Sequence, residues 1–245
     1  MPPPPLPFDA PAESSRYAKV RDERVCWLLS QHPASAAMLV DLGWFPNRNK
    51  ALKRLRRLAQ RKRIRLVGTV CRKTGRPEHV YCRYRPKADS LLHEVELTAL
   101  CLRLHAGRIL RGPHVTDAAV RPDAEVWINE VVYYLECDRG TMGYPQIVRD
   151  RFRKYRNCPH LCLWVCSTEA RREGLRERAA CVRSTALFAT MADALVSPHG
   201  AIWRDYSGNT AALPRETHDG QPPDGAARQS VPVIEPGRGG GTGSP

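Results

Sequence analysis

Three carboxylates stand at the ends of two strands that the sequence predicts. Asp123 comes directly before an apolar run over residues 124–128, and Glu136 and Asp138 end a second run that begins at residue 131. Residues i and i+2 of a strand share a face, so Glu136 and Asp138 point the same way. If a hairpin brings Asp123 alongside, the three side chains converge as ligands for a hard divalent cation, Mg2+ or Mn2+. A metal held there could activate water and stabilise the charge of a phosphodiester under attack.

The same cluster has a structural alternative, in which Arg121 and Arg139 pair with the carboxylates without any metal. Apolar periodicity predicts the elements that hold the cluster in either case. In chain order they are a helix, the hairpin, a helix, a strand, a charged helix and a last strand, over residues 91–104, 124–137, 145–156, 161–166, 168–182 and 201–206. This order implies a mixed sheet flanked by helices.

The cysteines indicate neither a secreted protein nor a zinc site. The chain has nine of them, and its Pro-rich start, residues 1–11, lacks the apolar run of a signal peptide, so we expect reduced thiols. Four potential zinc ligands lie close together at Cys158, His160, Cys162 and Cys166. No second ligand pair with CxxC spacing follows them, so we expect no zinc. No apolar stretch approaches the roughly 20 residues of a membrane span, which predicts a cytoplasmic protein without membrane contact.

Positive charge is concentrated in the first third of the chain. Residues 16–87 contain 20 Lys and Arg against four Asp and Glu, which gives a net charge of +16, whereas the whole chain carries +14. The remainder is therefore slightly acidic. Clustered Lys and Arg release counterions from a phosphate backbone, so this segregation predicts a polyanionic partner.

The basic segment has the layout of a winged helix-turn-helix. Candidate N-caps begin three helices, namely Asp22, Ser35 and either Asn47 or Asn49. Two strands follow, over residues 64–70 and 79–84, joined by a basic loop that contains the Gly a tight turn needs. The third helix would lie in the major groove of double-stranded DNA, with its first residues near the base edges and its later arginines on phosphates.

The residues expected to contact DNA lie on the third helix and in the basic loop: Asn47, Arg48, Asn49, Lys50, Lys53, Arg54, Arg57, Arg72, Lys73 and Arg76. A basic helix can also be no more than a solvated surface. The order of the helices together with a basic wing favours DNA contact.

The carboxylate motif resembles the PD-(D/E)xK nuclease signature, since twelve residues separate Pro122-Asp123 from Glu136-Cys137-Asp138. More narrowly, the chain resembles the replication-relaxation family of bacterial plasmids and mobile elements, whose members join a winged helix to a nuclease-like domain. The matching residues are His93-Glu94, Arg121 to Ala124, Tyr134 to Thr141 and Lys154-Tyr155. The resemblance covers about 16–207, and its most specific part is the run from Glu136 to Thr141.

The resemblance implies an α/β chain in which an N-terminal winged helix-turn-helix precedes a PD-(D/E)xK-like mixed sheet flanked by helices. Residues 16–87 are expected to form the DNA-binding domain and residues 90–207 the nuclease-like domain. Residues 1–15 are expected to be a disordered Pro-rich arm and residues 208–245 a disordered tail.

The sequence departs from the nuclease signature at its last position, where Asp138 stands in place of Lys. The change reverses the charge beside the attacking water. Either a basic residue of the next helix substitutes, with Lys154 the first choice and Arg149 the second, or cleavage is lost. Glu94 is expected to be the auxiliary carboxylate of the catalytic set, with Glu96 as the competing candidate.

These features predict a DNA-binding protein of a plasmid or mobile element that acts in replication, relaxation or transfer. Whether its second domain is a metal-dependent phosphodiesterase stays open, and His93 is expected to be a cap or packed residue. One alternative is a non-enzymatic regulator or adaptor with an inactive nuclease-like domain. Another is a protein-binding winged helix with acidic partners. Besides double-stranded DNA, the candidate partners are a second copy of the chain and mobilisation or replication proteins.

Overall fold

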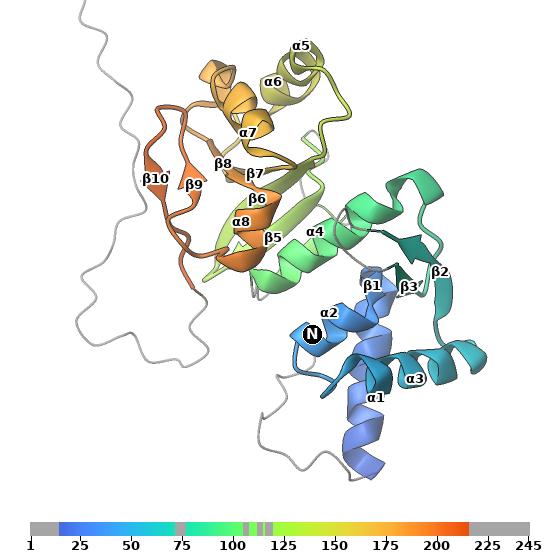
Figure 1. The fold of residues 1–245 in the computed structure, drawn as a ribbon. Helices are drawn as coiled ribbons and strands as arrows, with labels where there is room; N and C mark the ends of the chain where they lie inside the picture. Colours follow the sequence, from blue (N-terminus) through green and yellow to red (C-terminus); the bar gives the residue numbers. More distant parts are fainter. Residues whose placement is uncertain (1–14, 72–76, 105–107, 112–114, 116–119, 216–245) are drawn as a thin grey trace, which may run out of the picture.

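The fold consists of two units that share one helix. The computed structural model describes residues 15–71, 77–104, 108–111, 115 and 120–215, and Figure 1 shows their arrangement. The smaller unit contains, in chain order, α1 (Ser15–Gln31), β1 (Ala34–Ser35), α2 (Ala36–Asp41), α3 (Arg48–Gln60), β2 (Arg65–Val70) and β3 (Glu78–Cys82). Its three strands form an antiparallel sheet with β3 between β1 and β2.

Side-chain caps set the starts of α2 and α3, as the sequence predicts. The Ser35 hydroxyl accepts a hydrogen bond from the backbone N–H of Met38 at 3.4 Å, and the Asn47 side chain accepts one from the N–H of Lys50 at 3.0 Å. Helix α3 then buries one narrow apolar stripe, formed by Ala51, Leu55 and Leu58. Its remaining faces are left to charged residues, because a stripe at this spacing covers only one side of a helix.

Asp22 is not a helix cap, contrary to the prediction. Helix α1 begins at Ser15, and Asp22 lies inside it with only 4% of its surface exposed. Arg54 of α3 donates to one Asp22 oxygen through Nε at 2.6 Å and to the other through a second guanidinium nitrogen. A carboxylate buried this deeply requires such a partner, so the ion pair joins α1 to α3.

The larger unit is built on a seven-stranded mixed sheet. In spatial order its strands are β10 (Thr210–Ala211), β9 (Trp203–Arg204), β8 (Ala186–Thr190), β7 (Leu161–Cys166), β6 (Val131–Asp138), β5 (Ala124–Ile128) and β4 (Arg108–Arg111). Strands β6, β7 and β8 are parallel, and the other neighbours are antiparallel. The predicted mixed α/β class is therefore confirmed.

Helices cover both faces of this sheet. One face packs against α4 (Leu91–Arg103) and α8 (Met191–Val196), and the other packs against α5 (Tyr144–Ile147), the π-helical turn η3 (Val148–Phe152), α6 (Arg153–Tyr155) and α7 (Glu169–Arg176). Side chains alternate along β6, so Leu135 and Cys137 enter the core beneath α4, and Tyr134 enters the core beneath α6. The same alternation sends Glu136 toward η3 and α6.

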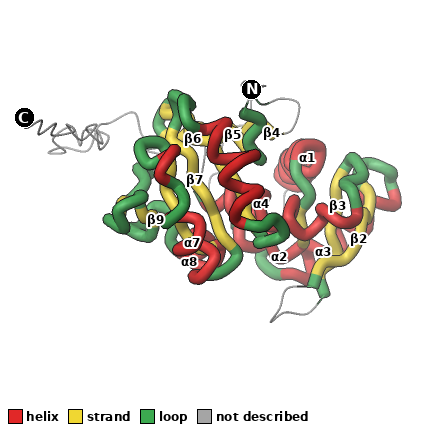
Figure 2. The backbone as a smooth tube through the Cα atoms, turned by 90° about the horizontal axis from the view of Figure 1, so that it is seen from above, coloured by secondary structure: helices red, strands yellow, loops and turns green. Residues whose placement is uncertain are grey.

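Helix α4 belongs to both units. Leu91 and Val95 are buried in the core of the smaller unit, whereas Leu97 and Leu100 are buried in the core of the larger one. Figure 2 shows α4 crossing the larger sheet on the side that faces β2 and β3. The boundary predicted at residues 87–90 divides the sequence into two segments. In the structure, however, the start of α4 after this boundary packs into the core of the smaller unit.

Several elements lie outside the predicted pattern. Strands β4 and β8 and helix α8 were not expected, and β10 follows the predicted end of the folded region at residue 207. All nine cysteines are free thiols. Among the helices of the described residues, none is both long enough and apolar enough to cross a bilayer.

We expect Arg54→Ala to lower the free energy of unfolding by about 2 kcal/mol, because it leaves the buried Asp22 carboxylate without its cation. The value lies below that of fully buried pairs because the Arg54 side chain keeps 23% of its surface exposed. Urea denaturation followed by circular dichroism measures the change. The exposed Arg57→Ala on the same helix is the control and should change stability by no more than about 0.5 kcal/mol. Equal losses in both variants would contradict a structural role for Arg54.

Candidate functional site

The β5–β6 hairpin brings Asp123 beside Glu136, as the sequence predicts. Asn129 and Glu130 form its turn with φ values of 48° and 65°, the left-handed pair that suits a tight hairpin. The register that follows places Ala124 opposite Leu135, one residue from each carboxylate. Asp123 Oδ2 accepts a hydrogen bond from the backbone N–H of Cys137 at 2.9 Å.

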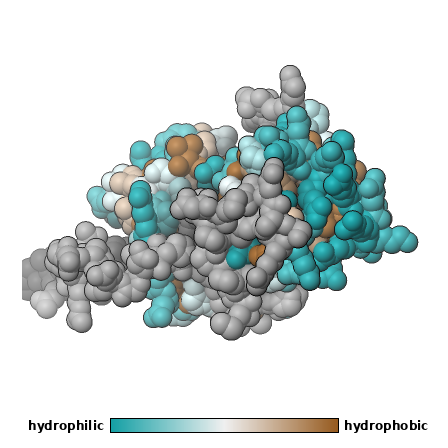
Figure 3. Space-filling view, turned by 90° about the horizontal axis from the view of Figure 1, so that it is seen from below, coloured by the Kyte–Doolittle hydropathy of each residue, from teal (hydrophilic) through white to brown (hydrophobic). Residues whose placement is uncertain are grey.

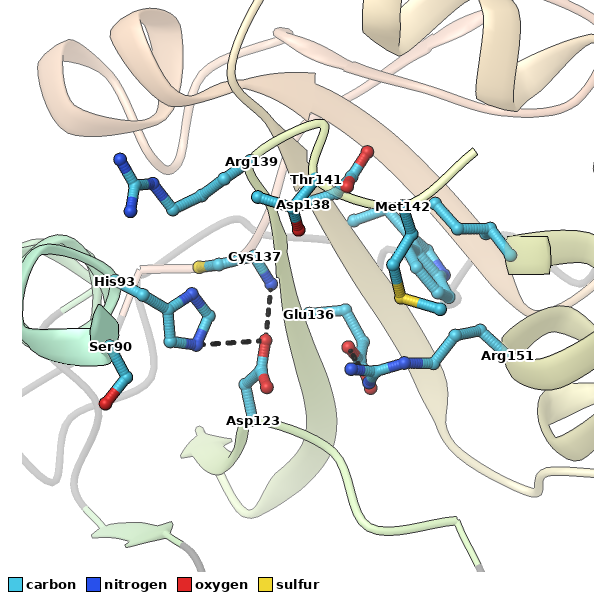
Figure 4. Close-up of a pocket in the computed structure, with 12 residues that line it drawn as sticks. Ser90, His93, Asp123, Glu136, Cys137, Asp138, Arg139, Thr141, Met142 and Arg151 are labelled. Atoms are coloured by element: carbon cyan, nitrogen blue, oxygen red, sulfur yellow. Dashed lines mark hydrogen bonds and ion pairs between the residues drawn. The ribbon is translucent and has the colours of Figure 1, made fainter. Parts of the chain in front are cut away.

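The carboxylates line a cavity of about 240 Å³ at the end of β6. Figure 4 shows Asp123 between His93 of α4 and Glu136. Asp138 and Arg139 come from the end of β6, and Arg151 comes from η3. The cavity is therefore lined by side chains from helical segments on both faces of the sheet.

Glu136 is held by two groups on the helical side of the sheet. Arg151 donates to its Oε2 at 2.6 Å, and the Tyr155 hydroxyl donates to its Oε1. Arg151 and Tyr155 are four residues apart, so they project from the same side of their helix. Burial, followed by the negative charge of Asp123, raises the pKa of Glu136 from 4.5 to about 8, against the opposing effects of Arg151 and Tyr155.

Asp123 is paired with His93 on the opposite side of the cavity. His93 Nε2 lies 3.6 Å from Asp123 Oδ2, and this contact raises the pKa of His93 despite its burial. Burial acts to raise the pKa of Asp123, but His93 and the amide of Cys137 outweigh it, so the pKa falls below 3.8. At neutral pH the cavity thus combines an ionised Asp123 with a Glu136 that holds a proton more readily than an ordinary carboxyl group.

Asp138 has a partner of its own. Arg171 of α7 donates to it through Nε at 2.5 Å, and the backbone N–H of Gly140 donates at 3.0 Å. These partners differ from the predicted ones, because Arg139 pairs with Glu96 at 3.3 Å instead. Asp138 lines the cavity with Asp123 and Glu136, but it is anchored from another helix.

The remaining residues of the predicted catalytic set lie outside this cavity. The Glu94 carboxylate pairs with Arg111 of β4, which also contacts His32 Nδ1 at 3.1 Å. Lys154 is exposed and does not line the cavity, and Arg149 is paired with Asp150 at 2.7 Å. Arg151 of the same helical segment lines the cavity instead.

The sequence reading missed both Arg151 and His93 as members of the site. Arg151 is one of several basic residues on one helix, and only its spacing of four from the buried Tyr155 sets it apart. His93 stands beside Glu94 in the helix, and the choice between them depends on which face of α4 meets the hairpin.

A metal requires carboxylate oxygens that are open to it, and here each carboxylate already has a cationic or hydrogen-bonding partner. His93 contacts Asp123, Arg151 holds Glu136 and Arg171 holds Asp138. Within the described part of the chain, no three His, Cys, Asp or Glu side chains are grouped so as to hold a metal ion. The arrangement is that of paired charges, and it does not fit a divalent cation without displacement of Arg151.

The expected DNA-contacting residues of α3 are mostly exposed. Asn49, Lys50, Lys53 and Arg57 are exposed, and Figure 3 shows hydrophilic side chains covering the part of the molecule that contains α1 and α3. Asn47 is used as the helix cap, and Arg48 donates to the Pro77 carbonyl at 3.4 Å. The expected wing residues Arg72, Lys73 and Arg76 lie outside the described residues.

Arg54 is the exception on this helix. Its guanidinium faces Asp22, not the solvent, which removes it from the surface expected to contact phosphates. Arg56, Gln60 and Arg61 are exposed in addition to the predicted residues. The basic face of α3 is defined here as the exposed set Asn49, Lys50, Lys53, Arg56, Arg57 and Arg61.

Comparison with protein-family models, with curated proteins and with solved structures finds no match for this chain.

We expect Glu136→Gln to become increasingly stable relative to the parent as the pH rises. The pKa of Glu136 is raised on folding, so the parent holds a proton that the unfolded chain releases between about pH 4.5 and 8, and its stability falls across that range. The Gln side chain of the variant cannot ionise, so the variant does not lose stability in this way as the pH rises. Urea denaturation at pH 6 and pH 9 gives the difference in free energy of unfolding between the variant and the parent at each pH. The contributions of all other titrating groups are the same in both proteins and cancel in this difference. A stability difference that is the same at both pH values would show that Glu136 is ionised throughout.

Proposed function

We propose that this protein binds double-stranded DNA through the basic face of α3. The observation that carries the proposal is the charge of this helix, whose 13 residues include six Lys and Arg and no Asp or Glu. An exposed surface of this kind neutralises phosphates and releases counterions. Asn47 caps α3, and Asn49 and Lys50 in its first turn are exposed.

We propose further that residues 16–87 form a winged helix. The order of three helices and two strands supports this. So does the short strand β1, which lies between α1 and α2 in the chain and pairs with β3. In such proteins the third helix enters the major groove, and its first residues approach the base edges. Asn49 and Lys50 are then the candidates for reading sequence, and Lys53, Arg56 and Arg57 for phosphate contact.

The larger unit is proposed to assist DNA binding without cleaving DNA. Each of its three carboxylates is paired with a basic side chain, as described above, and the Lys of the nuclease signature is replaced by Asp138. Together with the resemblance to the replication-relaxation family, this supports a cytoplasmic regulator or adaptor for replication, relaxation or transfer of a mobile element.

Metal-dependent cleavage is the second candidate function. Asp123 and Glu136 share a cavity at a strand end, as paired carboxylates of a nuclease core would. Mg2+ or Mn2+ would be the metal and Asp123 and Glu136 its ligands, once Arg151 had moved away from Glu136.

We expect Lys53→Ala to weaken binding to duplexes of any sequence and to reduce the slope of log affinity against log salt by about 1. The reason is that Lys53 is an exposed cation on the proposed contact face. Fluorescence anisotropy with a random-sequence duplex, measured at several salt concentrations, tests this. Arg183→Ala, an exposed basic residue of the larger unit, is the matched control and should leave the slope unchanged. Identical slopes for the parent and Lys53→Ala would contradict the placement of DNA on α3.

Supercoiled plasmid should stay intact when it is incubated with the purified protein and Mg2+ or Mn2+, although its mobility on a gel should be retarded. The pairing of each carboxylate with a basic side chain is the reason. Glu136→Ala is assayed in parallel. Metal-dependent nicking by the parent that this variant lacks would replace the adaptor proposal with the nuclease.

A further inference from the structure

Two carboxylates of the cavity are balanced by cations that belong to the chain itself. Arg151 donates to Glu136 Oε2 at 2.6 Å, and His93 Nε2 lies 3.6 Å from Asp123 Oδ2. When His93 is protonated, these two side chains supply two positive charges, which is the charge of one divalent cation. The two carboxylates that a metal would need are therefore neutralised without a metal.

The Arg151 guanidinium interacts with both of these carboxylates. Figure 4 shows its side chain extending to the Glu136 carboxylate, in the cavity that Asp123 also lines. Burial acts to lower the pKa of Arg151, but the charges of Glu136 and Asp123 outweigh burial and raise that pKa above its ordinary value. A metal ion held by the same two carboxylates would be stabilised by the same field.

The π-helical turn η3 gives Arg151 its position. Ile147 and Phe152 are both buried in the core beneath this helical segment although they are five residues apart, which is the spacing of a π turn. In a regular α-helix the covered position would fall four residues after Ile147, at Arg151. Because η3 contains the extra residue, Phe152 enters the core instead. The Arg151 side chain reaches Glu136 and keeps 35% of its surface exposed.

The surroundings of Glu136 favour this guanidinium over a metal ion. The Glu136 side chain is only 3% exposed, so a cation that replaces Arg151 has to lose water in order to bind. Mg2+ dehydrates reluctantly and usually keeps several waters, whereas a guanidinium is weakly hydrated. The Tyr155 hydroxyl donates to the other oxygen of Glu136, which leaves fewer lone pairs for a second cation.

We propose that Arg151 is a built-in cation that takes the place of a divalent metal ion at Asp123 and Glu136, and that its guanidinium excludes Mg2+ and Mn2+. The inference rests on the proposed function of the larger unit, which is to assist DNA binding without cleavage, and it names the side chain responsible. Shortening Arg151 leaves an oxygen of Glu136 without its partner. A metal ion bound there then restores the missing positive charge.

The test titrates Mn2+ into the purified protein at pH 8 and follows free Mn2+ by electron paramagnetic resonance. The parent and Glu136→Gln should give the same titration, because Glu136 of the parent is not available to a metal. Arg151→Ala should bind Mn2+ at least about tenfold more tightly than the parent, and excess Mg2+ should compete. Mn2+ should also raise the melting temperature of Arg151→Ala but not that of the parent, because an ion that binds the folded state stabilises it.

Three further variants locate the effect. Arg151→Gln keeps a hydrogen-bond donor near Glu136 but removes the charge, so it should also gain Mn2+ binding. The double variant Arg151→Ala, Glu136→Gln should lose the gained site. Arg153→Ala removes an exposed arginine of the same helical segment that does not line the cavity, and it should titrate like the parent. Circular dichroism shows whether each variant is folded.

Two results would overturn the inference. One is Mn2+ binding by the parent that Glu136→Gln abolishes, whatever the Arg151 variants do. The other is the absence of Mn2+ binding in folded Arg151→Ala and Arg151→Gln, since something other than the guanidinium would then exclude the metal. The proposed function is tested separately by the plasmid assay, in which nicking by the parent would end the role without cleavage.

Discussion

The position of Glu136 on a covered central strand constrains the whole larger unit. Strand β6 is inside a seven-stranded sheet, and helices pack on both of its faces. A carboxylate at 2% exposure in such a place cannot be left unpaired, because burial of an unsatisfied charge costs several kcal/mol. The protein meets this requirement with Arg151, Tyr155 and a raised pKa. Arg151 and Tyr155 thereby join η3 and α6 to the sheet.

Helix α4 connects the carboxylates of the cavity to the smaller unit. His93 contacts Asp123 beside the hairpin. The next residue, Glu94, pairs with Arg111, and Arg111 also contacts His32 at the end of α1. Burial and the charge of Arg111 lower the pKa of His32 to about 3, so this histidine is neutral and can accept a hydrogen bond from the guanidinium. One helix thus ties both polar networks together, and the proposed DNA-binding unit cannot turn freely against the cavity.

Local chemistry made part of this structure predictable. Ser35 and Asn47 begin helices because their side chains replace missing backbone partners, and Asn129-Glu130 turns the hairpin that sets Asp123 beside Glu136. These signals are contained within a few residues of sequence. Strand β8 was missed since its five residues, Ala186–Thr190, are short and fully buried, without the alternation that distinguishes a strand from a helix. Strand β4 was missed because Arg begins and ends its four residues.

The partners of the carboxylates could not be predicted, because they come from distant parts of the chain. Arg151, Lys154 and Arg149 are equivalent basic residues until the helix is docked, and only the docked face that also buries Tyr155 selects Arg151. Likewise, Arg54 and Arg57 are alike in sequence, and the crossing of α1 over α3 alone decides that Arg54 meets Asp22. Charge segregation along the chain therefore predicts a basic surface correctly while it misassigns individual members of that surface.

The separation of charges is compatible with both an acidic cavity and the proposed DNA binding. Cations of the smaller unit are exposed along α3, whereas the three carboxylates that line the cavity are paired with His93, Arg151 and Arg171. Paired carboxylates project little field into solvent, so they do not repel a phosphate backbone that approaches the exposed cations. Their lone pairs nevertheless remain hydrogen-bond acceptors at short range. The carboxylates thus act at short range within the cavity, whereas the proposed affinity for a phosphate backbone comes from the exposed cations of α3.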